Sequence, residues 1–162
     1  MIMIEADAIC EAALFCILLL ISVIDVMDMK IYNRHIAIMS VSGIIARITL
    51  GPAGWTGAVE ASLFWGAAGA MVLLLIRILS RGGLGGGDVK LGMAIGIWMG
   101  SSDIIIVLMF SFMAAGVFGL LLLLLKGQKV LHMKVPFGPF LSAGALLQEM
   151  GFLGFMTLGV VL

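Results

Sequence analysis

Long apolar stretches separated by short polar or glycine-rich connections make up almost the whole of this 162-residue chain. A stretch of roughly 17–25 apolar residues is long enough to cross the hydrocarbon core of a bilayer as a helix. The pattern therefore predicts an all-α integral membrane protein, built as a bundle of six transmembrane helices. We place them at residues 8–27, 34–50, 57–79, 88–100, 103–125 and 136–162.

The fourth segment, residues 88–100, is the exception in length. About 13 residues rise only ~20 Å as an α-helix, whereas the hydrocarbon core is ~30 Å thick. We therefore expect its N-terminal end, with Asp88, to lie below the membrane surface. Irregular glycine-rich backbone is tolerated at such depth only where protein or a wet cavity surrounds it. The sequence thus predicts a cavity beside Asp88.

The composition supports a membrane protein, since 63% of the residues are hydrophobic, 11% are charged, and the mean hydropathy is +1.28. A soluble domain of this length would need far more polar surface. We expect one membrane-embedded domain over residues 1–162, without a removable signal peptide, because the N-terminus lacks a basic region and a cleavage site. Cys10 and Cys16 form no Cys-x-x-Cys pair, so neither a zinc site nor a disulfide framework is expected.

The positions of the basic residues orient the six segments. In a six-span arrangement, eight of the nine Lys and Arg residues fall on one side, with Arg47 as the exception. Short loops rich in Lys and Arg lie on the cytoplasmic side of a membrane. We therefore expect both termini outside the cytoplasm, and Asp25 and Asp88 at its face. The eight basic residues are Lys30, Arg34, Arg77, Arg81, Lys90, Lys126, Lys129 and Lys134.

Two aspartates occupy unusual positions in this arrangement. Asp25 ends the first apolar segment, and Asp88 opens the fourth one after five glycines in six residues. Carboxylates are costly at membrane depth, so a functional site is the default hypothesis. The alternatives are a helix N-cap for Asp88 and a simple interfacial charge for Asp25. Small residues also follow Asp88 at steps of four, on one helix face where another helix can approach closely; they are Gly92, Gly96 and Gly100.

Two carboxylates that share a proton can hydrolyse an amide, one as general base on water and the other as general acid. Asp25 would lie at the negative end of its helix dipole, and Asp88 at the positive end of its own. We therefore expect Asp88 to ionise more readily and Asp25 to hold the shared proton. Asp28, three residues past Asp25, is an alternative partner, but we favour a role in neutralising Lys30 or Arg34.

Three sequence patches carry a resemblance to a known family. The run Gly85-Gly86-Gly87-Asp88 is a Gly-x-Gly-Asp motif, continued by Val-Lys-Leu. Asp25 is followed six residues later by Ile31-Tyr32-Asn33, where the family has Ile-Pro-Asn. A third patch, residues 135–141, reads Val-Pro-Phe-Gly-Pro-Phe-Leu. Together the patches resemble the type IV prepilin peptidases, bacterial relatives of the Gly-x-Gly-Asp membrane aspartyl proteases.

The resemblance implies catalysis by Asp25 and Asp88, without a metal or other cofactor and without a covalent intermediate. It implies removal of basic leaders, which end in glycine, from prepilin-like or pseudopilin-like precursors at the cytoplasmic face of the bacterial inner membrane. No nucleic-acid partner is expected besides this substrate and the lipid bilayer, and homo-oligomerisation is left open. The further residues assigned to substrate binding or to loops at the site are Gly85, Gly86, Gly87, Asp28, Lys90, Pro136, Phe137, Gly138 and Pro139.

Many longer relatives carry a cytoplasmic domain with paired cysteines, which is linked to N-methylation of the new N-terminus. The chain has no room for such a domain between its first two apolar segments. We therefore expect a compact, peptidase-only form without the methyltransferase domain. In this it is similar to the relatives that serve tight-adherence pili or similar export systems.

Other functions remain open from the residues alone. Asp25 and Asp88 could relay protons or bind cations in a small transporter subunit, although no internal repeat supports one. A catalytically silent assembly factor and a leader peptidase for another class of exported peptide are further alternatives. Glu149 is either a third acid near the site or the end of the last helix, and we favour the helix end.

Overall fold

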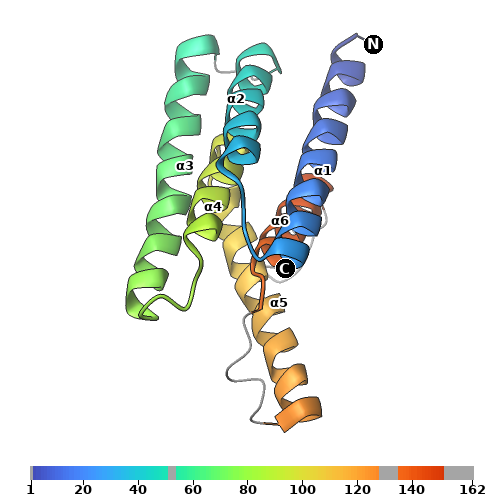
Figure 1. The fold of residues 1–162 in the computed structure, drawn as a ribbon. Coiled ribbons are helices and arrows are strands. Elements are labelled where there is room, and N and C mark those ends of the chain that lie inside the picture. The colour runs from blue at the N-terminus through green and yellow to red at the C-terminus, as the bar shows by residue number, and fades with distance from the viewer. Residues whose placement is uncertain (1, 51–53, 128–134, 152–162) are drawn as a thin grey trace, which may run out of the picture.

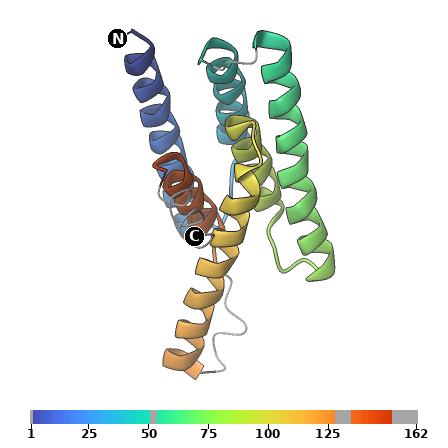
Figure 2. The same ribbon diagram turned by 180° about the vertical axis from the view of Figure 1, so that it is seen from behind.

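The computed structural model describes residues 2–50, 54–127 and 135–151. Within these residues the chain forms six α-helices and no strand, so the predicted all-α class is confirmed. The helices are gathered into one bundle, from which the second half of α5 extends (Figures 1 and 2). Their bounds are α1 Ile2–Asp28, α2 Asn33–Leu50, α3 Gly54–Leu79, α4 Gly86–Met99, α5 Asp103–Lys126 and α6 Gly138–Glu149.

Each predicted segment overlaps one of these helices, and α4 shows how the boundaries differ. It begins at Gly86 rather than at Asp88, and its N-cap is Gly85. Asp88 therefore lies inside the first turn, so the alternative in which this aspartate is the N-cap is wrong. With 14 residues, α4 is a short helix, as the sequence predicts.

The last helix differs most from its prediction. We expect one segment over residues 136–162, but α6 ends at Glu149. Gly151 follows in the left-handed conformation, with φ 71°, which is a common way for a helix to end. A single helix over the whole segment is therefore wrong, whereas a helix end at Glu149 is confirmed. Residues 152–162 lie outside the described part of the chain.

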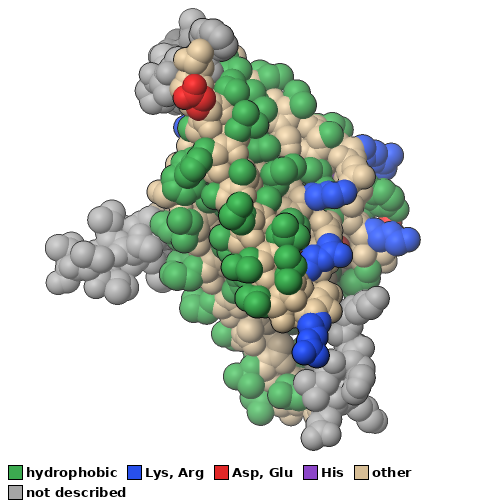
Figure 3. All heavy atoms as spheres, turned by 90° about the vertical axis from the view of Figure 1, so that its left-hand side faces the viewer, with side chains coloured by type: hydrophobic (Ala, Val, Ile, Leu, Met, Phe, Trp, Pro, Cys, Tyr) green, Lys and Arg blue, Asp and Glu red, His purple; other side chains and the backbone are tan. Residues whose placement is uncertain are grey.

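Three helices of the described residues are long and apolar enough to cross a membrane. These candidate spans are Ile9–Asp28 in α1, Thr56–Leu79 in α3 and Asp103–Lys126 in α5. Apolar side chains also cover most of the face shown in Figure 3, where Lys and Arg gather along one edge. The chain is thus an integral membrane protein, while the count of six spans stays a prediction. Of the eight basic residues assigned to one side, Lys129 and Lys134 lie outside the described residues.

α4 lies at the centre of the bundle, which explains how so short a helix is accommodated. It packs mainly against α3 and α2, and it also contacts α5 and α6 (Figures 1 and 2). Nine of its 14 residues are buried, including Leu91 and Ile95. Because other helices surround α4, its backbone does not have to span the hydrocarbon core by itself. The end that carries Asp88 is therefore enclosed by protein.

Glycines set the close approach of α3 and α4. A Cβ on Gly96 would overlap the carbonyl oxygen of Trp65 and would lie 2.9 Å from the Cα of Gly66. From the other side, a Cβ on Gly69 would lie 2.9 Å from the carbonyl oxygen of Gly92. Backbones that come this close leave no room for a side chain at the crossing. The prediction that Gly92 and Gly96 form a helix-packing face is confirmed.

Gly100, the last residue of the predicted glycine face, has a different role. It follows the end of α4 as the C-cap, in the left-handed conformation with φ 53°. A Cβ there would lie 2.9 Å from Nε of Arg47, which α2 contributes. Gly100 therefore ends α4 beside Arg47, the one basic residue that the six-span arrangement does not place on the cytoplasmic side.

α6 joins α1 to α5 on the other side of the bundle. Oγ of Ser111 in α5 donates a hydrogen bond to the carbonyl oxygen of Phe140, at 3.0 Å. Gly144 allows this approach, since a Cβ on it would lie 2.6 Å from the same Oγ. Leu18 and Ile21 of α1 are buried in the shared core with α6. This packing brings the start of α6 to the end of α1.

We predict that Gly96→Ala weakens the packing of α3 on α4, because the new methyl group would overlap backbone atoms that cannot move away. The expected loss is about 1–3 kcal/mol in the free energy of unfolding, measured by thermal unfolding in detergent. Gly116→Ala is the matched control, because a Cβ there meets no atom within 4 Å. It should leave stability unchanged or raise it by roughly 0.5–1 kcal/mol. Equal stabilities of the two variants would contradict the packing described for α4.

Candidate active site

Asp25 lies one turn before the end of α1, and only 5% of it is exposed. Its Oδ2 accepts a hydrogen bond from the backbone N–H of Gly138, 3.0 Å away, at the start of α6. The unpaired N–H groups at a helix N-terminus are favourable partners for a carboxylate. The start of α6 thus holds Asp25 from a position 113 residues further along the chain.

Gly138 has no room for a side chain at this contact. A Cβ on it would lie 2.6 Å from Oδ2 of Asp25. Pro139 follows in the first turn of α6, where proline has a suitable φ and loses no hydrogen bond. Phe137 is buried, and its ring packs on that of Phe112 in α5 with 4.8 Å between centroids. These residues anchor the start of α6 beside Asp25.

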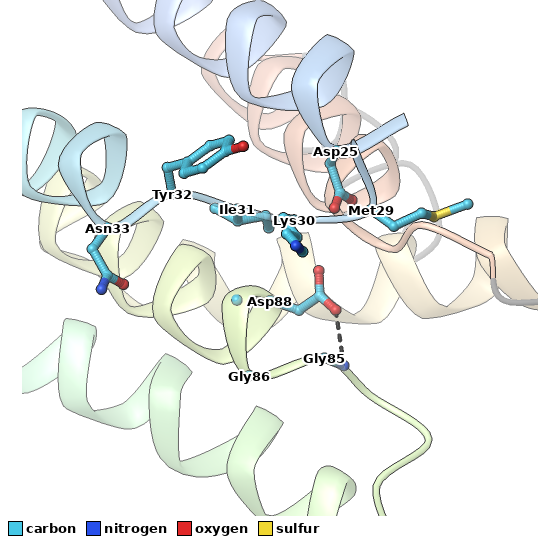
Figure 4. Close-up of a pocket in the computed structure, with 10 residues that line it drawn as sticks. Asp25, Met29, Lys30, Ile31, Tyr32, Asn33, Gly85, Gly86 and Asp88 are labelled. Carbon is cyan, nitrogen blue, oxygen red and sulfur yellow. Dashed lines mark hydrogen bonds between the residues drawn. The ribbon is translucent and has the colours of Figure 1, made fainter. Parts of the chain in front are cut away.

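Asp88 is the third residue of α4, and only 7% of it is exposed. Its Oδ2 accepts a hydrogen bond from the N–H of Gly85, at 3.1 Å. Gly85 is extended, with φ −67° and ψ 148°. A carboxylate in the third helical position that binds the N-cap N–H is one half of a capping box. In Figure 4 the other carboxylate oxygen of Asp88 points into the cavity.

A cavity of about 360 Å³ lies between the two aspartates, as the sequence predicts for Asp88. Asp25 enters it from α1 and Asp88 from α4, and the α1–α2 connection crosses it (Figure 4). The glycines before Asp88 form another part of its wall. The complete lining is Asp25, Met29, Lys30, Ile31, Tyr32, Asn33, Gly85, Gly86, Gly87 and Asp88.

The α1–α2 connection is held against the start of α4 at two points. Ile31 packs directly on Gly87, where a Cβ would lie 2.9 Å from that of Ile31. Nζ of Lys90 donates a hydrogen bond to Oδ1 of Asn33, at 2.8 Å. From the sequence, Ile31 and Asn33 are expected only as parts of a motif and not as residues of the cavity wall. The signal that could have placed them there is their fixed spacing from Asp25.

Asp28 does not form the ion pair with Lys30 or Arg34 that we favour from the sequence. Its Oδ2 accepts a hydrogen bond from the hydroxyl of Tyr32 at 3.1 Å, and the Arg34 guanidinium lies 5.5 Å from the centroid of the Tyr32 ring. The hydrogen bond to Asp28, and then the charge of that carboxylate, raise the pKa of Tyr32. This pairing depends on the path of the connection after α1, which no helical spacing rule describes.

The structure brings together five of the site residues expected from the sequence, namely Asp25, Asp88 and Gly85–Gly87. Asp28 and Lys90 stand outside the cavity lining, and each bonds to a residue that belongs to it. Pro136–Pro139 also stand outside, and Gly138 reaches the site through Asp25. A role of these outer residues in substrate binding stays a prediction.

Glu149 is not a third acid at this cavity. It lines a separate cavity of about 340 Å³ together with Glu11 of α1. The other charges that act on it are those of Asp103 and Arg47, which also lie outside the lining of the first cavity. Glu149 therefore marks the end of α6.

Two carboxylates on opposite sides of one cavity can act together on a water molecule and an amide. Each aspartate has one oxygen held by a backbone N–H, that of Gly138 or that of Gly85. A carboxyl group fixed in this way is oriented before the substrate arrives. In the part of the chain that the structure describes, no group of three or more His, Cys, Asp or Glu side chains could hold a metal ion. Two carboxyl groups oriented in this way on one cavity are suited to acid–base chemistry.

Known proteins resemble this chain over most of its length. The model of the type IV leader peptidase family matches residues 12–120, a range that includes Asp25 and Asp88. A prepilin leader peptidase/N-methyltransferase of Bacillus subtilis (strain 168) is 30% identical over 131 residues, which cover 81% of this chain and 51% of the relative. The chain thus spans about half the length of this curated relative. No solved structure matches the chain. The chain belongs to the type IV leader peptidase family.

Proposed function

We propose that this chain is a membrane aspartyl endopeptidase that removes the leader from type IV pilin-like precursors, either prepilins or pseudopilins. One observation carries the proposal: Asp25 and Asp88, from two different helices, line the same cavity. Membership in the type IV leader peptidase family supports a leader peptide as the substrate. The relative from Bacillus subtilis, described as a prepilin leader peptidase, supports precursors of the pilin type.

The proposed reaction needs a water molecule and a peptide carbonyl group between the two aspartates. The ionised carboxylate takes a proton from the water as the water oxygen attacks the carbonyl carbon. The other carboxyl group gives its proton to the amide nitrogen as the C–N bond breaks. The pair ends with its proton on the opposite aspartate, and exchange with water restores the starting state. The hydrogen bonds from Gly138 and Gly85 keep both carboxyl groups in place during these steps.

The substrate would meet a wall of backbone at Gly85–Gly87, which line the cavity. Because glycine has no side chain, an extended peptide can approach this wall closely. We assign Lys90 and Asp28, next to the cavity, to contacts with the leader. The residues Pro136–Pro139 position α6 and border the site from the opposite side.

The basic residues support a site at the cytoplasmic face of the bacterial inner membrane. Lys30 lines the cavity, and Lys90 is bonded to Asn33, which also lines it. Positively charged residues concentrate on the cytoplasmic side of membrane proteins. We therefore propose six spans, both termini outside the cytoplasm, and one peptidase domain over residues 1–162.

The short α1–α2 connection supports a peptidase without methyltransferase activity. Only Met29–Tyr32 separate α1 from α2, so no domain is inserted there. The relative from Bacillus subtilis is described as a methyltransferase as well as a peptidase. We propose that this chain cleaves the precursor and leaves the new N-terminus unmethylated.

We predict that Asp25→Asn and Asp88→Asn each abolish cleavage of a pilin-type precursor. Asparagine keeps the shape of the side chain but cannot take up or release the proton. The cleavage rate should therefore fall by roughly 100-fold to 10,000-fold. Product length is read by mass spectrometry with purified protein. Thermal unfolding of both variants should remain close to that of the wild type.

Asp28→Asn decides between the two candidate partners of Asp88. Because Asp28 is bonded to Tyr32 and stands outside the cavity lining, this variant should keep a kcat close to that of the wild type. A loss of its proposed contact with the leader should raise KM instead. Glu60→Gln, which changes an exposed carboxylate of α3, controls for the loss of one negative charge. Wild-type cleavage by Asp25→Asn together with inactivity of Asp28→Asn would reject the proposed pair.

We predict that the end of the bundle that carries the cavity faces the cytoplasm. In a background without Cys10 and Cys16, Arg81→Cys in the exposed connection before α4 should resist a membrane-impermeant maleimide in intact spheroplasts. Thr56→Cys, exposed near the start of α3, should react without permeabilisation. Permeabilised cells should label both. The reverse pattern of labelling would overturn the proposed orientation.

A further inference from the structure

Arg77 lies against the start of α4, beside the cavity. It belongs to the last turn of α3. A Cβ on Gly86 would overlap Nη1 of Arg77 and would lie 3.4 Å from its Cζ. The guanidinium therefore occupies the space that a side chain at Gly86 would need. Gly86 lines the cavity and is separated from Asp88 by one residue.

Helix packing sets this position. Leu73, four residues before Arg77, packs on Gly92 of α4, four residues after Asp88. Residues four apart share a helix face, and α3 and α4 run in opposite directions side by side (Figures 1 and 2). The contact between Leu73 and Gly92 therefore places Arg77 level with Asp88. The backbone is fixed there as well, since the carbonyl oxygen of Arg77 accepts a hydrogen bond from the N–H of Gly82 at 2.9 Å.

A cation at this place requires a compensating charge. The N-terminus of a helix carries a partial positive charge, which disfavours a guanidinium beside it. The Asp88 carboxylate lies in that first turn, with Asp25 across the cavity and Arg77 on Gly86, two residues before it. Two aspartates that share one proton carry one negative charge, and the cations that face it are Arg77 on the α3 side and Lys30 in the cavity lining. A set without net charge costs less to bury than the aspartate pair alone.

We propose that Arg77 is a positioning residue of the active site, whose guanidinium packs on Gly86, holds the loop of Asp88 in place and sets a positive charge beside the aspartate pair. This inference rests on the proposed function, because it concerns the same aspartate pair. Asp25 disfavours a second negative charge on Asp88, and Arg77 opposes that effect. Arg77 acts through Asp88 and has no contact with the reacting atoms.

The first test measures the carboxyl group directly and needs no substrate. Hydrophobic carbodiimides modify protonated carboxyl groups in membrane proteins, and peptide mass spectrometry locates the product. With purified full-length protein at neutral pH, Arg77→Met should speed modification of Asp88 roughly 3–10-fold. Arg77→Lys keeps the charge and should stay within about twofold of the wild type. Arg81→Met, the matched control, removes an exposed positive charge from the connection that follows α3 and should label like the wild type. Equal labelling of Arg77→Met and Arg81→Met overturns the proposal.

The second test uses cleavage of a pilin-type precursor. Arg77→Met should lower kcat roughly tenfold and change KM less than about twofold, because the aspartate pair is affected and peptide contacts are not. Gly86→Ala puts a methyl group where the guanidinium lies, so it should lower kcat for the same reason, and any effect on the peptide wall should appear in KM. The double variant should then be no slower than the slower single variant. If the losses of kcat in the two single variants multiply in the double variant, Arg77 does not act through its contact with Gly86. That result would overturn the proposal.

The two proposals fail separately. A protein that shows charge-dependent labelling of Asp88 but cuts no pilin-type precursor keeps the role of Arg77 and loses the proposed substrate. A protein that cuts the precursor equally well in wild-type and Arg77→Met forms keeps the proposed function and loses the role of Arg77. Thermal unfolding of each variant excludes general destabilisation as the cause of a change.

Discussion

The hydrogen bond from the N–H of Gly138 to the carboxylate of Asp25 joins the two sides of this bundle. α1 alone offers Asp25 only a helix C-terminus, where the carbonyl groups disfavour a negative charge. The N-terminus of α6 supplies the N–H donor that the end of α1 cannot offer. The packing of α6 on α5 through Ser111 and Gly144 fixes where this donor lies. A buried carboxylate without a donor is costly. The hydrogen bond of Asp25 therefore ties the position of α1 to the positions of α5 and α6.

This contact also changes the electrostatic argument that the sequence supports. Considered by their own helices, Asp25 lies at a negative end and Asp88 at a positive end. In the structure each aspartate accepts one hydrogen bond from a backbone N–H, Asp25 from Gly138 and Asp88 from Gly85. The sequence does not show that α6 contacts Asp25, because Gly138 lies 113 residues further along the chain. The shared proton is therefore best treated as a property of the pair.

Local patterns predict most of the fold, and long-range register decides the rest. Apolar segment length predicts the helices, and spacing by four predicts the face of α4 on which α3 packs. The sequence leaves two alternatives for Glu149, because hydropathy does not report the left-handed turn at Gly151. It does not reveal the hydrogen bond between Tyr32 and Asp28, which depends on the path of the connection. Arg77 reaches the site only through the register of α3 against α4, which no local pattern encodes.

The three glycines directly before Asp88 are better explained by crowding than by backbone freedom. A Cβ on Gly85 would lie 2.8 Å from Oδ2 of Asp88, one on Gly86 would overlap Arg77, and one on Gly87 would lie 2.9 Å from Cβ of Ile31. These three glycines have ordinary negative φ values, so backbone freedom does not require them. Each makes room for a different neighbour: the carboxylate, the guanidinium and the α1–α2 connection. The motif thus packs three neighbours closely around the first turn of α4, while Asp88 lines the same cavity as Asp25.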